Sequence, residues 1–150
     1  MIADLESERA VIGGILVDCG PLPPGIDSLT PDDFAEPKHA AIFAAMLALA
    51  ERKEPIDDVT VSHELGGGDW TKLVTKLSAD MPTSANVGYY ANLVRRDARR
   101  RDCVRVMGEA LVECRKPGVD GDGVIASVVT ELGSIAASRG VSNRTPVRCS

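Results

Sequence analysis

The sequence is poor in aromatic residues, which make up 3% of its 150 positions, whereas hydrophobic residues make up 44%. A folded core must therefore be built from aliphatic side chains. No segment alternates apolar and polar residues with a period of two for long enough to indicate a β-strand. These absences predict an all-α protein: a small multi-helix globular subdomain followed by an extended antiparallel helical hairpin.

Long hydrophobic runs are also missing. The longest, residues 40–50, is well short of the roughly 20 apolar residues that span a bilayer. No basic segment followed by an apolar stretch and a cleavage site opens the chain. We therefore expect a cytoplasmic protein that has no membrane partner. The formal net charge of −5 argues weakly against nucleic-acid binding by the surface as a whole.

The sequence lacks the motifs of catalysis and of metal binding. Its four cysteines form no C-x-x-C pair, and its two histidines lie far apart: Cys19, Cys103, Cys114 and Cys149, with His39 and His63. We expect incidental or buried thiols and no metal site. The glycines at 66–68 are followed by Asp-Trp-Thr-Lys, whereas a phosphate-binding loop needs Lys-Ser or Lys-Thr after its glycines. We expect no catalytic residue and no cofactor in this chain.

Helix signals dominate the first half of the chain. We expect helices at 5–17, at 37 to about 53, at 59–65 and at about 69–79, and a capped helix start at Thr30-Pro31. The pair Gly13-Gly14 lies inside the first helix, where each glycine costs roughly 1 kcal/mol relative to alanine. Such a pair is favoured where another backbone packs close. Residues 1–81 are predicted to form the globular subdomain.

Residues 82–140 are predicted to form the hairpin, because two apolar-striped helical runs flank Pro117-Gly118. A two-helix arm cannot cover all of its apolar faces internally, so we expect it to self-associate. The predicted self-association residues are Ile125, Val128, Val129, Leu132 and Ile135 on the second run, with Val104 and Leu111 on the first. The polar residues 141–150 are predicted to begin a linker.

A basic cluster lies on the first run of the hairpin. The arginines are Arg95, Arg96, Arg99, Arg100 and Arg101. Guanidinium groups in this pattern indicate contact with phosphates or with an acidic partner. The alternatives are a solvated helix face, or arginines that bridge to acidic residues on a neighbouring helix. No aromatic residues interleave with them to stack bases, which disfavours single-strand binding.

Three segments in register resemble the N-terminal domain of bacterial replicative DNA helicases of the DnaB type, over roughly residues 5–138. The first segment is Glu-Arg-Ala-Val-Ile-Gly-Gly-Ile-Leu at 8–16. The second is Leu-Thr-Pro-Asp-Asp-Phe at 29–34, which continues through His39, Ile42, Phe43, 55–57 and 59–61. The third is Pro-Thr-Ser-Ala-Asn at 82–86, which continues through Tyr90-Ala91 to Arg101. The glycines at 66–68 and the segment around Trp70 depart from the pattern of the family.

The resemblance implies the collar of a hexameric helicase ring, in which hairpins of neighbouring subunits pair. It implies docking of primase during DNA replication, an influence on a helicase loader, and contact with DNA through the whole protein. ATP and Mg²⁺ would bind in a separate RecA-like motor, which these 150 residues do not contain. We therefore expect an N-terminal piece of a larger ATP-dependent helicase. The alternatives are a freestanding phage or plasmid collar that acts as loader or inhibitor, and a nucleic-acid-binding module that uses the 95–105 helix.

Overall fold

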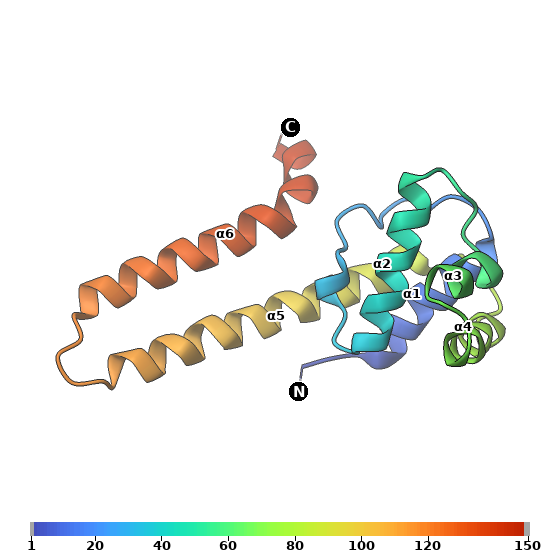
Figure 1. The fold of residues 1–150 in the computed structure, drawn as a ribbon. Coiled ribbons are helices and arrows are strands. Elements are labelled where there is room, and N and C mark those ends of the chain that lie inside the picture. The colour runs from blue at the N-terminus through green and yellow to red at the C-terminus, as the bar shows by residue number, and fades with distance from the viewer. Residues whose placement is uncertain (1, 149–150) are drawn as a thin grey trace. The chain divides into compact units, whose positions relative to one another are not determined.

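Every regular element in the described part of the chain is a helix, which confirms the predicted all-α class. The computed structural model describes the backbone of residues 2–148 and the side chains of residues 2–137. The elements are α1 (Leu5–Asp18), η1 (Pro31–Asp33), α2 (Pro37–Glu51), α3 (Asp58–Glu64), α4 (Asp69–Ala79), α5 (Val87–Cys114) and α6 (Gly121–Arg148), as labelled in Figure 1. None of the helices described is both long enough and apolar enough to cross a membrane.

The chain divides into two compact units. We call Ala3–Ala98 the head unit, and Arg99–Ser150 together with Ile2 the hairpin unit. Helix α5 contributes its first part to the head unit and its remainder to the hairpin unit. The sequence placed the boundary before this helix, at 81/82. Because α5 is one uninterrupted helix, no capping or breaking residue marks the point where its surroundings change.

The core of the head unit is aliphatic, as the shortage of aromatic residues predicts. Helix α4 packs against α1 and α3, while α2 packs against α1, α3 and η1. The buried side chains of α1 and α2 include Ile12 and Ile15 on one and Ile42 and Phe43 on the other. The ring of Phe43 also contacts the ring of Phe34, with 5.0 Å between centroids.

The Gly13-Gly14 pair lies where another part of the chain approaches α1 closely. A Cβ atom on Gly13 would lie 2.5 Å from the backbone oxygen of Leu77 in α4 and would overlap the side chain of Met81. A Cβ atom on Gly14 would overlap the side chain of Val87. The expected close approach is therefore confirmed, and it explains why the α1–α4 contact requires glycine.

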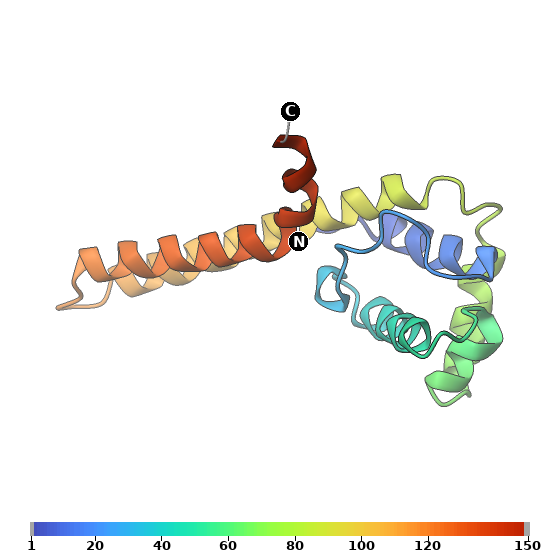
Figure 2. The same cartoon turned by 90° about the horizontal axis from the view of Figure 1, so that it is seen from above.

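The hairpin unit is formed by the second part of α5 and by α6, which run antiparallel and side by side (Figures 1 and 2). The chain reverses between them through Gly118, whose φ of 77° favours glycine. Between the two helices, Val106 is almost fully buried. Arg105 of α5 forms an ion pair with Glu131 of α6 at 3.7 Å. The sequence predicted that the second helix ends near residue 140, whereas α6 continues to Arg148.

The side chains of the predicted linker at 141–150 fall outside the described residues. Residues 141–148 are described only as backbone at the end of α6, and residues 149–150 are outside the described range. Its role as a linker stays a prediction.

Candidate interaction surfaces

Six large apolar side chains of the hairpin unit are exposed to solvent. They are Val104, Met107, Leu111 and Val112 on α5, and Ile125 and Val129 on α6, with exposed fractions from 53% to 65%. We call these six residues the apolar face. Taking a fully exposed side chain of this kind to full burial contributes about 1.5–3 kcal/mol, and each of these six still has more than half of its surface available for burial.

The predicted self-association residues divide into two groups. Val104, Leu111, Ile125 and Val129 belong to the apolar face. Val128, Leu132 and Ile135 are only partly exposed, and Val128 lines a groove between α5 and α6.

Periodicity placed all five α6 residues in one stripe. That stripe is wide enough that one edge of it faces α5 and the other faces solvent. The inward position of Val128 is therefore a correction to its predicted place on the exposed surface.

Met107 and Val112 are members of the apolar face that the sequence prediction omitted. Both continue the stripe of Val104 and Leu111 on α5, at three and eight residues after Val104. The signal was present in the helical spacing.

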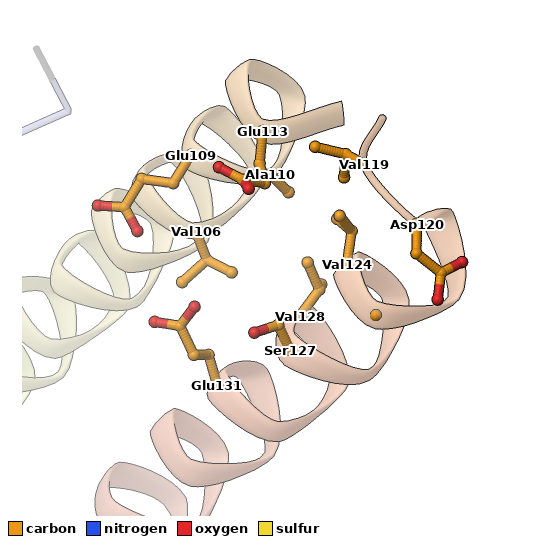
Figure 3. A pocket seen from close by; sticks show the side chains of 11 residues that line it. Val106, Glu109, Ala110, Glu113, Val119, Asp120, Val124, Ser127, Val128 and Glu131 are labelled. Atoms are coloured by element: carbon orange, nitrogen blue, oxygen red, sulfur yellow. The ribbon is translucent and has the colours of Figure 1, made fainter. Parts of the chain in front are cut away.

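A groove of about 410 Å³ separates α5 from α6 near the turn of the hairpin. Figure 3 shows Val106 and Ala110 of α5 on one side and Val124 and Val128 of α6 on the other. The remaining apolar wall is Val119, in the turn. The carboxylates that line the groove are Glu109, Glu113, Asp120 and Glu131. We call this feature the acidic groove.

Basic residues outside the lining partly balance these carboxylates. Arg105 lies 3.4 Å from Glu109 and 3.7 Å from Glu131, and Lys116 lies 3.0 Å from Glu113. The Asp120 side chain accepts a hydrogen bond of 3.2 Å from the backbone N–H of Asp122 at the start of α6. Arg105 therefore pairs with two glutamates, so the carboxylates of the groove outnumber the basic groups that pair with them.

The arginines of the basic cluster are not equivalent. Arg95 is buried and donates hydrogen bonds to the side chains of Ser28 and Asn92. It belongs to the packing of the head unit, which corrects its predicted place on a contact surface.

The other four arginines differ in exposure. Arg96 is exposed and lies 3.4 Å from Asp97. Arg101 donates a hydrogen bond of 2.8 Å to the backbone oxygen of Ile2. Arg99 is partly exposed and Arg100 is exposed. Arg96 and Arg100 are therefore the members most accessible to a partner.

A buried carboxylate joins α1 to the start of α2. Glu8 is 1% exposed, and its carboxylate lies 2.8 Å from Nδ1 of His39. It also accepts hydrogen bonds from the backbone N–H groups of Ala35, at 2.7 Å, and Glu36, at 3.3 Å. Burial acts to raise the pKa of Glu8, but the hydrogen bonds from His39, Ala35 and Glu36 together outweigh burial and lower that pKa.

The sequence prediction did not identify this buried pair. Glu8 lies three residues before Val11 and four before Ile12, so it occupies a core position of α1. That position was the available signal. The arrangement holds two segments of the head unit together, and neither side chain is accessible to a substrate.

The described residues contain no group of three or more histidine, cysteine, aspartate or glutamate side chains that could hold a metal ion. Within the same part of the chain, Cys19, Cys103 and Cys114 are free thiols. Cys149 lies outside the described residues. His63 is exposed on α3.

Comparison with known proteins shows the family of the chain. Residues 1–96 match the sequence model described as "DnaB-like helicase N terminal domain". The chain is 37% identical over 107 residues to the replicative DNA helicase DnaB of Geobacillus stearothermophilus, covering 67% of this chain and 24% of that protein. It is 30% identical over 157 aligned residues to the DnaB helicase of Leifsonia xyli subsp. xyli, covering 96% of this chain and 33% of that protein.

Solved structures give the same result for the fold. The N-terminal domain of DnaB helicase from Mycobacterium tuberculosis matches with a TM-score of 0.73 and 30% sequence identity, covering 88% of this chain and 97% of that one. A second solved structure, that of a DnaB-like replicative helicase and its interactions with primase, matches with a TM-score of 0.70. At 21% identity, with coverage of 87% of this chain and 31% of that one, it shows likeness of fold. The chain spans a quarter to a third of the length of the two helicases named above.

Proposed function

This chain belongs to the family of DnaB-like helicase N-terminal domains, and we propose that it acts as a self-associating collar in DNA replication. The observation that carries the proposal is the apolar face of the hairpin unit, whose six side chains are each more than half exposed. A second copy of the chain can cover this face. In the proposed assembly, hairpins pair and the pairs build the hexameric ring of a replicative helicase.

The collar has no catalytic role of its own in this proposal. ATP hydrolysis and Mg²⁺ binding are assigned to a motor domain of the whole helicase. We further propose that the collar docks primase and influences a helicase loader. The likeness of fold to a DnaB-like replicative helicase that was solved for its interactions with primase supports the first of these.

Self-association is tested by placing a charge on the apolar face. Val129 is 65% exposed, so Val129→Asp is expected to weaken association without unfolding the chain. Thr130→Asp is the matched control, because Thr130 is a neighbouring exposed residue of α6 that does not belong to the apolar face. The measurement is molar mass by light scattering over a range of concentrations, with circular dichroism to verify folding.

The expected result is association in the wild-type chain and in Thr130→Asp, and loss of association in Val129→Asp. A wild-type chain that stays monomeric at high micromolar concentration would contradict the proposal. So would an unchanged oligomer in Val129→Asp.

A second candidate function is nucleic-acid binding, which the exposure of Arg96 and Arg100 favours. Contacts of this kind weaken steeply with salt, because bound phosphates release counterions. Charge reversal by Arg96→Glu, and separately by Arg100→Glu, is expected to weaken binding of forked DNA measured by fluorescence anisotropy. Absence of wild-type binding at about 50 mM salt, where such contacts are strongest, would exclude this function for the chain.

A further inference from the structure

The acidic groove and the apolar face lie on opposite sides of the hairpin unit. An α-helix turns by about 100° per residue, so residues two apart point in nearly opposite directions. On α5, Glu109 lies two residues from both Met107 and Leu111. On α6, Ser127 of the groove stands in the same relation to Ile125 and Val129. A copy that covers the apolar face therefore leaves the groove open.

The groove exists because the side chains between the two helices are small. None of its apolar walls is larger than valine, and one of them is Ala110 (Figure 3). Packed helices normally fill the space between their axes with interlocking side chains. Here a groove of about 410 Å³ remains, and it is open to solvent. One or two large apolar side chains of a partner would fill this space.

The charges around the groove select the partner. Among the eleven described residues that line it, four are carboxylates and none is lysine or arginine. Arg105, from outside the lining, is shared between Glu109 and Glu131. A partner that carries lysine or arginine beside its apolar side chains would complement this rim. An acidic partner would be repelled.

We propose that the acidic groove binds a basic amphipathic helix of a partner protein. Large apolar side chains of that helix enter the space between Ala110 and Val128, and its cationic side chains pair with Glu109, Glu113 and Glu131. This inference rests on the proposed function in one respect: self-association uses the apolar face, so the groove stays available in the assembled collar.

The test uses the full chain and a fluorescein-labelled synthetic helical peptide of about 18 residues, which is ~27 Å long when helical. The peptide carries leucine on one face and lysine on the flanking positions. One control peptide has glutamate in place of lysine. A second control has the same composition as the probe, but its leucines are distributed around the helix. Binding is measured by fluorescence anisotropy at low salt and at physiological salt.

Ala110→Phe fills the groove without changing its charge and is expected to weaken binding of the probe at least tenfold. The double change Glu109→Gln with Glu131→Gln is expected to weaken binding about fivefold and to reduce its salt dependence. Glu51→Gln removes an exposed carboxylate of α2 in the head unit and is the matched control. It is expected to leave binding unchanged.

Equal affinity for the probe and for either control peptide would overturn the proposal, as would unchanged binding by Ala110→Phe with its fold preserved in circular dichroism. Loss of self-association in Ala110→Phe would make a second copy the occupant, and would also overturn it. Val129→Asp separates the two proposals. If that variant still self-associates while probe binding depends on Ala110, the collar proposal fails and the groove assignment stands.

Discussion

Replacing Glu8 tests whether a buried carboxylate holds the head unit together. Its side chain crosses from α1 to the segment before α2, where it accepts two backbone N–H groups and contacts Nδ1 of His39 at 2.8 Å. Glu8→Ala removes all three interactions. The N–H groups of Ala35 and Glu36 lose their acceptor, and the space left by the carboxylate is too enclosed for free solvation.

The expected loss follows from the cost of unpaired buried groups. Each buried donor without a partner costs about 1–3 kcal/mol. Ala35 and Glu36 are only partly buried, so we take the low end of about 1 kcal/mol for each of the three lost interactions, including the one with His39. Glu8→Ala is then expected to lower the free energy of unfolding by about 3 kcal/mol. Glu8→Gln keeps the shape and one acceptor oxygen, and its expected loss is about 1–2 kcal/mol.

The pH dependence gives a second, independent signature. The pKa of Glu8 is lowered in the folded chain relative to its ordinary value of 4.5. A carboxyl with a lowered folded pKa stabilises the fold above its unfolded pKa, and this contribution disappears as the pH falls through the folded pKa. The stability difference between wild type and Glu8→Gln is therefore expected to shrink below a pH of about 4.5.

The measurement is urea unfolding followed by circular dichroism at several pH values. Glu6→Ala is the control on the same helix, because Glu6 is exposed and forms a surface ion pair with Arg9 at 2.8 Å. A surface pair of this kind contributes at most about 1 kcal/mol. If Glu8→Ala and Glu6→Ala were equally stable, or if wild type and Glu8→Gln lost stability in parallel below a pH of about 4.5, the reasoning would be refuted.

Two further predictions concern stability. Gly13→Ala is expected to lower the melting temperature, because the new methyl group would lie 2.5 Å from the backbone oxygen of Leu77. The methyl group of Gly133→Ala would meet nothing within 4 Å. Gly133→Ala is therefore expected to raise the melting temperature, because alanine has a higher helix propensity than glycine. Equal melting temperatures for the two alanine variants would contradict the close approach. Arg95→Ala is expected to destabilise the head unit, since its buried guanidinium is hydrogen-bonded, while Arg100→Ala at an exposed position is expected to change unfolding by less than about 0.5 kcal/mol. If Arg95→Ala melted at the same temperature as wild type, the structural role of Arg95 would be contradicted, and Arg95 would again be a candidate contact residue.

Local rules predicted the elements of the fold well. Proline at 37 and the Thr30-Pro31 start act through nearby backbone groups, so their consequences are visible within a few residues. In the structure, the backbone N–H of Thr30 donates to Asp33 at 3.0 Å, and α2 begins at Pro37. The need for a close approach at Gly13 could also be predicted, because helix-interior glycine is unfavourable without one.

Distant partners could not be predicted from local rules. Glu8 and His39 are 31 residues apart, and no periodicity specifies that one core position carries a charge which another segment will satisfy. The partner of Arg95 could not be predicted either. The spacing of Arg95 matches a basic surface cluster, but its hydrogen-bond partner Ser28 lies in a loop 67 residues away along the chain. The sequence could predict that α6 is a helix with an apolar stripe. It could not predict which half of that stripe faces α5, because that depends on how the two helices of the hairpin pack.

The two sides of the hairpin follow from one property of its sequence, which is the size of the side chains between its helices. Valine and alanine at these positions leave a groove near the turn instead of a filled seam. Three large apolar side chains at this end of the hairpin, Met107, Leu111 and Ile125, are instead exposed to solvent. A partner that covered these exposed side chains would add apolar burial that the hairpin lacks by itself. The apolar face and the acidic groove are therefore the two surfaces to which our proposals assign a second copy and a basic helix.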